Sequence, residues 1–95
     1  MRQVAIEGFG GPEVLEVQEV PTPAPGPGEV LVETRFAAVN PVDVATRTGA
    51  LFRADLHGPP PIRLGWDVAG VVIAVGDGVG RVRPGQRVAA ISDRR

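Results

Sequence analysis

Glycine and proline divide this chain into short pieces, and this limits its folds more than any other feature. There are 13 glycines and 10 prolines among the 95 residues. They lie between short segments rich in valine and isoleucine and do not form a repeat. Proline and glycine are turn residues that interrupt regular structure. Many short strands separated by such turns favour a barrel-like sheet over alternating strands and helices.

Five segments have the composition expected of strands. In residues 29–38, apolar residues and Thr34 alternate with Glu33 and Arg35, which predicts a strand with one apolar face. The run 66–75 is largely apolar and is expected to be buried on both faces. The remaining three are residues 2–7, 15–20 and 86–91.

Two proline-containing segments connect these strands. Residues 21–28 (PTPAPGPG) predict an extended connection stiffened by prolines, too short to separate two domains. Pro84 and Gly85 suit the two central positions of a type II turn.

One segment has the signals of a helix. Asn40 is a good N-cap and Pro41 suits the first helical position. Asp43 places a carboxylate in the first turn, and Arg47 places a cation in the last turn. Gly49 is a natural residue to end the helix. The chain is therefore expected to be mainly β, with one short helix.

The composition of the chain argues against several classes of function. The formal net charge is −1, so neither nucleic acid nor an anionic membrane is an expected partner. There is no cysteine, which excludes disulfides, thiolate metal ligands and a thiol nucleophile. The N-terminus lacks the pattern of a signal peptide, and the apolar run 68–75 is far shorter than the ~18 residues that span a bilayer. These features predict one small cytoplasmic domain over residues 1–95.

The glycine clusters do not predict a dinucleotide-binding loop. Gly8, Gly10 and Gly11 are followed by Pro12, and neither this cluster nor residues 76–81 satisfies G-x-G-x-x-G. Neither cluster precedes a segment with helical periodicity, so both are expected to be turns.

Five motifs occur in an order that resembles a known family. They are the opening MRQVAIEGFGGPEVLEVQEV, the proline-rich PTPAPGPGEVLVE, then NPVD, GWDVAGVVIAVG and VRPGQRVAA. Together they resemble the N-terminal domain of medium-chain dehydrogenase/reductases, specifically the zinc-independent quinone oxidoreductase branch. The resemblance implies a GroES-like, partly open β-barrel, which in the family precedes a Rossmann domain that binds NADPH. The chain is expected to be this N-terminal substrate-side domain in incomplete form.

The resemblance also implies that no zinc is bound. Zinc-dependent alcohol dehydrogenases have a ligand cysteine where this chain has Asn40, and Gly-His-Glu where it has Gly65-Trp66-Asp67. Asparagine and tryptophan are poor zinc ligands, and His57 has no partner at ligand spacing. Without a Lewis acid, hydride transfer needs an acceptor that is already electrophilic, such as a quinone or an enone.

Three residues are the candidate site. The resemblance implies that Asn40 and Asp43 lie beside the cofactor and that Trp66 walls the substrate, while a catalytic residue stays unknown. Each residue also has a structural alternative: an N-cap for Asn40, a first-turn acid for Asp43 and a core anchor for Trp66. Several relatives have a tyrosine where this chain has Ala45, so a ring contact is absent here.

The function predicted from these observations is NADPH-dependent reduction of quinones or activated alkenes, with this chain alone inactive. Two alternatives stay open: a non-catalytic GroES-like interaction module and an inert truncated product. A homodimer is compatible with the sequence but not indicated by it.

Overall fold

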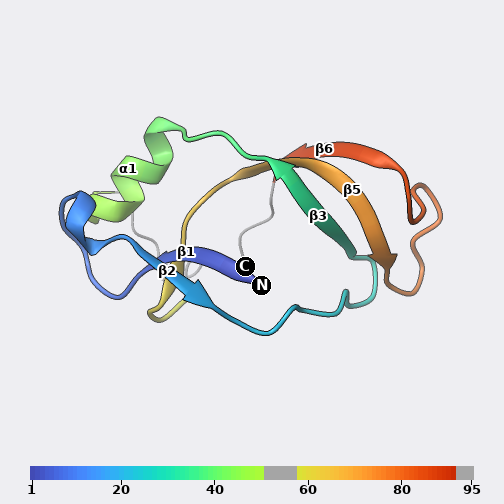
Figure 1. The fold of residues 1–95 in the computed structure, drawn as a ribbon, viewed down its shortest axis with the longest axis horizontal. Helices are drawn as coiled ribbons and strands as arrows, with labels where there is room; N and C mark the ends of the chain where they lie inside the picture. The colour runs from blue at the N-terminus through green and yellow to red at the C-terminus, as the bar shows by residue number, and fades with distance from the viewer. Residues whose placement is uncertain (51–57, 92–95) are drawn as a thin grey trace. The chain divides into compact units, whose positions relative to one another are not determined.

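The computed structural model describes residues 1–50 and 58–91, and these form two compact units. The first unit contains Met1–Pro21 and Val39–Trp66, and the second contains Thr22–Ala38 and Asp67–Ile91. A three-stranded antiparallel sheet forms the framework of each unit (Figure 1).

The sheet of the first unit has the order β2-β1-β4. Its strands are β1 (Arg2–Ile6), β2 (Glu16–Glu19) and β4 (Ile62–Arg63), and the short 3-10 helix η1 (Pro12–Val14) lies between the first two. The C-terminal half of β1 is its buried part: Ala5 and Ile6 are fully buried, and Ile62 pairs with Ile6 and is also buried. This apolar pairing is the centre of the first unit.

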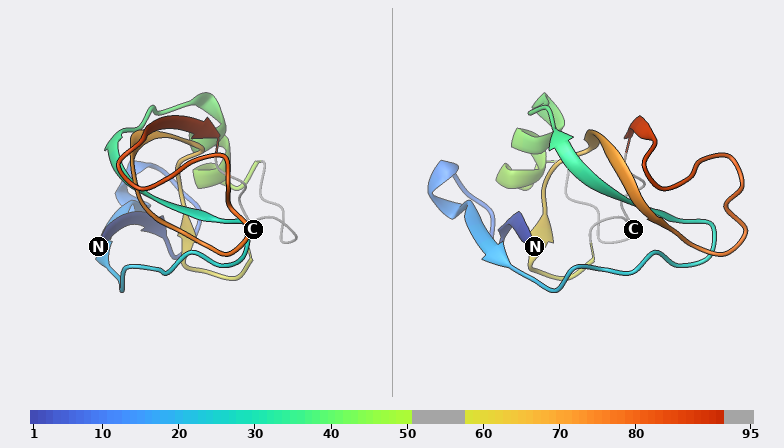
Figure 2. Two further views of the ribbon diagram at one scale, coloured as in Figure 1. Left: turned by 90° about the vertical axis from the view of Figure 1, so that its right-hand side faces the viewer. Right: turned by 45° about the vertical axis from the view of Figure 1, so that its right-hand side comes forward.

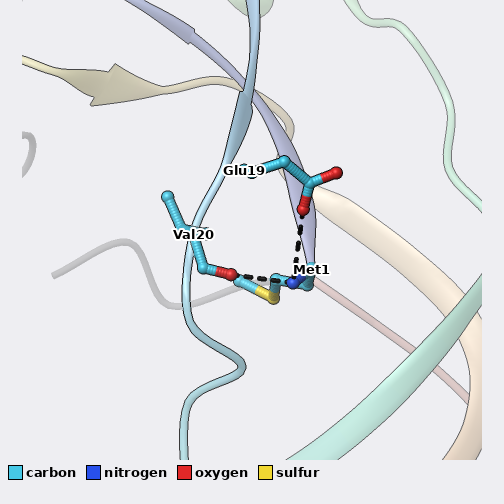
Figure 3. A network of polar contacts seen from close by, with 3 residues as sticks. All are labelled: Met1, Glu19 and Val20. Atoms are coloured by element: carbon cyan, nitrogen blue, oxygen red, sulfur yellow. Dashed lines mark hydrogen bonds and ion pairs between the residues drawn. The ribbon is translucent and has the colours of Figure 1, made fainter.

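The N-terminus is tied to the end of β2, as Figure 3 shows. The ammonium group of Met1 donates a hydrogen bond to the carbonyl oxygen of Val20 at 2.7 Å and lies 3.9 Å from Oε2 of Glu19. The amide of Val20 in turn donates to the carbonyl oxygen of Met1 at 2.9 Å. These backbone bonds extend the β1–β2 ladder by one residue pair, whereas the exposed ion pair adds little stability.

The predicted helix is confirmed as α1 (Pro41–Thr48). Asn40 is the N-cap residue in extended conformation, and Gly49 ends the helix in the left-handed region with φ 89°. The C-terminal end is fixed to the turn that follows β1: Nε of Arg47 donates to the carbonyl oxygen of Gly10 at 3.2 Å, and the amide of Gly10 donates to the carbonyl oxygen of Arg47 at 3.1 Å.

The sheet of the second unit has the order β3-β5-β6. Its strands are β3 (Val30–Phe36), β5 (Asp67–Val75) and β6 (Arg87–Ile91), with β5 in the centre, and the views of Figure 2 show how these three strands lie together. Burial along β5 is uneven: Val72 is fully buried, but Ile73 is 47% exposed. The expectation that this run is buried on both faces is therefore only partly right.

The predicted alternation along β3 is wrong. Its pairing with β5 shifts register between Leu31 and Val32 and again between Thr34 and Phe36. The first shift leaves Ile73 of β5 without a partner in the register, and the second leaves Arg35 of β3 without one. An extra residue reverses the face on which the following side chains of its own strand lie, so the shift at Arg35 interrupts the alternation of β3. A single apolar face along the whole strand therefore does not form, and Phe36 at its end is 76% exposed.

Two glycines allow the backbone of the second unit to pack closely. A Cβ atom at Gly70, in the middle of β5, would collide with the carbonyl oxygen of Glu33. A Cβ atom at Gly76, just after β5, would collide with the carbonyl oxygen of Gly26. Glycine is needed at both positions because the obstacle is backbone, which cannot move aside as a side chain can.

The predicted fold class is confirmed: mainly strand with one α-helix, and open sheets that do not close on themselves. Within residues 1–50 and 58–91, the one α-helix is too short to cross a membrane.

Replacing Gly70 by alanine is expected to lower the free energy of unfolding by about 2–3 kcal/mol, because an added methyl group in a packed sheet forces the backbone apart. Thermal or urea denaturation followed by circular dichroism measures this change. Gly80→Ala is the matched control in the same unit, since nothing lies within 4 Å of its added Cβ. Equal stability of the two variants would contradict the close approach at Gly70.

Candidate functional site

The three predicted site residues all lie in the first unit. Asn40 precedes α1, Asp43 is in its first turn, and Trp66 follows β4 by three residues. The local sequence explains the first two positions: Pro41 fixes the start of the helix, so Asn40 becomes the N-cap and Asp43 the third helical residue.

Asp43 connects the start of the helix to the segment before Trp66. The residue is only 8% exposed. Oδ2 accepts a hydrogen bond from the backbone amide of Asn40 at 2.9 Å, and Oδ1 accepts one from the backbone amide of Gly65 at 3.0 Å. Both oxygens of this buried carboxylate therefore bind backbone amides, which is how a buried charge is made tolerable.

This geometry indicates a positioning role for Asp43. The Asn40 bond is half of a capping box, and a carboxylate in the first helical turn is also favoured by the helix dipole. The Gly65 bond is long-range and fixes the residue next to Trp66. One side chain thereby sets the places of Asn40 and Trp66 together. Direct contact between Asp43 and a cofactor stays a prediction.

Asn40 and Trp66 are both half-buried, so each residue packs against the protein with one part and remains accessible with another. Asn40 has the backbone of an N-cap, with φ −117° and ψ 158°, and its carbonyl oxygen accepts the amide of Asp43 at 2.9 Å. Its side-chain amide can both donate and accept hydrogen bonds. The indole of Trp66 provides a flat apolar surface on which a planar ring can stack. The two residues therefore offer complementary chemistry on the same unit.

Asp67 satisfies a nearby backbone group. It begins β5 in the second unit, and its Oδ1 accepts the amide of Ala38 at 2.7 Å. This bond joins the end of β3 to the start of β5 beyond the last backbone pair.

The sequence analysis did not find Gly65 as a member of the site. Its φ of 102° lies in the left-handed region, which favours glycine, and its amide binds Asp43. The sequence contained one signal, a glycine directly before the tryptophan. The partner of this glycine, Asp43, lies 22 residues earlier in the sequence, so the local sequence around Gly65 does not reveal the bond.

Among the residues that the structure describes, no group of three or more His, Cys, Asp or Glu side chains could hold a metal ion. His57 lies outside those residues.

Comparison with known proteins adds independent evidence. Residues 26–94 match the family described as the alcohol dehydrogenase GroES-like domain. Quinone oxidoreductase of Rattus norvegicus is 41% identical over 93 residues, which is 97% of this chain and 27% of that protein. The structure of Escherichia coli quinone oxidoreductase complexed with NADPH superposes with a TM-score of 0.87 at 31% identity, over 94% of this chain and 26% of that one. The crystal structure of an NAD-dependent alcohol dehydrogenase is 48% identical, with a TM-score of 0.84, over 94% of this chain and 25% of that one.

The chain belongs to the alcohol dehydrogenase GroES-like domain family, because the family match covers more than half of its length. Its relatives include quinone oxidoreductases of the medium-chain dehydrogenase/reductase superfamily, to whose N-terminal part it corresponds. The resemblance stated from the motifs is thus confirmed. The chain spans about a quarter of the length of these relatives.

Asp43→Ala is expected to lower the free energy of unfolding by about 2–4 kcal/mol, since it leaves two backbone amides without their acceptor. Trp66 is the only tryptophan, so its fluorescence reports the local effect, and a red shift is expected as the segment loosens. Asp43→Asn keeps one good acceptor oxygen and should lose about half as much stability.

Asp77→Ala is the control, because Asp77 is exposed and no side-chain hydrogen bond ties it to the described residues. An Asp43→Ala variant with the stability and emission of the Asp77 control would show that the carboxylate does not hold the segment.

Proposed function

We propose that this chain is the substrate-side domain of an NADPH-dependent, zinc-independent oxidoreductase that reduces quinones or activated alkenes. The observation that carries the proposal is that the carboxylate of Asp43 binds the amide of Asn40 and the amide of Gly65, the residue directly before Trp66. Support comes from relatives that are quinone oxidoreductases, one of them complexed with NADPH.

The residues of the candidate site suit the nicotinamide end of the cofactor and not its phosphates. No G-x-G-x-x-G occurs in the sequence, so a pyrophosphate has no glycine-rich loop here. The half-buried amide of Asn40 matches the hydrogen-bonding groups of a carboxamide. When bound, the reduced nicotinamide supplies the hydride. In this proposal the chain orients that ring and the acceptor and excludes water, while Asp43 keeps Asn40 in place.

An acceptor class follows from the side chains. Trp66 offers an aromatic face to a flat ring, and neither Asn40 nor Trp66 is a ligand that zinc prefers. Without a metal to polarise a simple carbonyl, the acceptor must be activated by its own conjugation, as in a quinone or an enone. In this proposal the protein acts in the cytoplasm, the location expected in the sequence analysis.

The test is steady-state reduction of a simple quinone by the complete protein, with NADPH and NADH compared as donors. The residue 1–95 chain by itself should give no appreciable turnover. Asn40→Ala should lower kcat/KM by about tenfold or more, because a hydrogen bond to the cofactor is lost. Trp66→Ala should raise KM for the quinone, whereas Trp66→Phe, which keeps an aromatic face, should retain most of the affinity.

The same assay after treatment with a chelator tests the absence of zinc. Unchanged turnover is expected. Loss of activity that added zinc restores would overturn the zinc-independent mechanism. Quinone reduction by the 95-residue chain alone would overturn the proposal that this chain supplies only the substrate side of the enzyme.

A further inference from the structure

The connection between β5 and β6 in the second unit is a firmly held loop. The amide of Gly85 donates to the carbonyl oxygen of Val72 at 2.8 Å, and the amide of Val72 donates to the carbonyl oxygen of Gln86 at 2.9 Å. The amide of Gln86 closes the predicted turn on the carbonyl oxygen of Arg83 at 3.1 Å, with Gly85 at φ 93°. The end of this loop is thus hydrogen-bonded both to itself and to the central strand.

Two arginines of this loop face a common open hollow of about 670 Å³. Arg81 and Arg83 line it together with Gly80, Pro84 and Gln86. Val82 between the two arginines is half-buried, whereas both arginines are exposed. The backbone amide of Arg83 donates to Oε1 of Gln86 at 3.3 Å, so the NH₂ group of Gln86 is left as a further donor.

Positive charge in this loop is not balanced by nearby carboxylates. Among residues 1–50 and 58–91, Arg81 and Arg83 form no ion pair, and no acidic residue lines the hollow. Residues 77–87 contain three arginines and one aspartate, a local charge of +2 (3 − 1), although the whole chain has a net charge of −1. Among the residues that the structure describes, two arginines and the side chain of Gln86 therefore line a hollow that no carboxylate lines.

We propose that this hollow, lined by Arg81, Arg83 and Gln86, binds the phosphate group of a small phosphorylated molecule. A guanidinium group presents a rigid fork of N–H donors that matches phosphate oxygens in pairs. A carboxylate is satisfied by one such fork, whereas a phosphate dianion has oxygens and charge enough for two. The proposal is independent of the oxidoreductase function, because all of its residues lie in the second unit and none belongs to the candidate cofactor site.

The test is a titration of the isotopically labelled protein with inorganic phosphate, and then with a phosphate monoester, at constant ionic strength, followed by amide NMR. Saturable shifts confined to residues 80–86 are expected. The double substitution Arg81→Ala with Arg83→Ala should weaken binding about tenfold or more. The corresponding lysine pair keeps the charge but not the forks, and should also weaken binding.

Arg2→Ala is the matched control, because it removes one exposed positive charge from β1 in the other unit and should leave phosphate affinity unchanged. Shifts that do not saturate, or an equal loss of affinity in the control, would overturn the proposal. Binding of a nucleic acid strand without binding of the monoester would also overturn it, in favour of a surface for polyanions.

Discussion

The carboxylate of Asp43 accepts hydrogen bonds from the amides of Asn40 and Gly65, and the arrangement of the candidate site depends on this pair of bonds. A buried carboxylate is stable only where hydrogen-bond donors surround it. The segments that contain Asn40 and Gly65 must therefore stay where their amides can reach the carboxylate of Asp43. The N-cap residue and the residue before Trp66 are therefore fixed by one group. A site for a cofactor and an acceptor needs this kind of fixed first contact, since orientation contributes much of the rate in hydride transfer.

Glycine has a corresponding role in the second unit. The motif GWDVAGVVIAVG contains Gly70 and Gly76, and both lie where a backbone carbonyl oxygen occupies the space of a side chain. These glycines allow β5 to lie close to the backbone of residues 26–33. The motif is therefore explained in large part by packing, and of its residues only Trp66 and its neighbour Gly65 bear on the candidate site.

The helix could be predicted almost to the residue because its signals are local. Asn40, Pro41 and Gly49 each act within a few residues of their own position, through dihedral preference or capping. Five of the six strands in the described residues were also predicted to within one or two residues, whereas β4 was not predicted. The break in the alternation of β3 could not be predicted, since the register shift at Arg35 arises from pairing with β5 and changes no local pattern. The Asp43–Gly65 bond was missed for the same reason: it joins residues distant in sequence.

Hydrogen exchange at the amide of Gly65 tests the central structural claim most directly, because that amide donates to the buried carboxylate. If Asp43 holds the segment, this amide should be protected to nearly the same free energy as the amides of β1, and should exchange only when the unit unfolds. Exchange at the rate of an exposed loop, while β1 remains protected, would contradict this claim. It would mean that Asp43 does not fix the segment before Trp66 relative to Asn40.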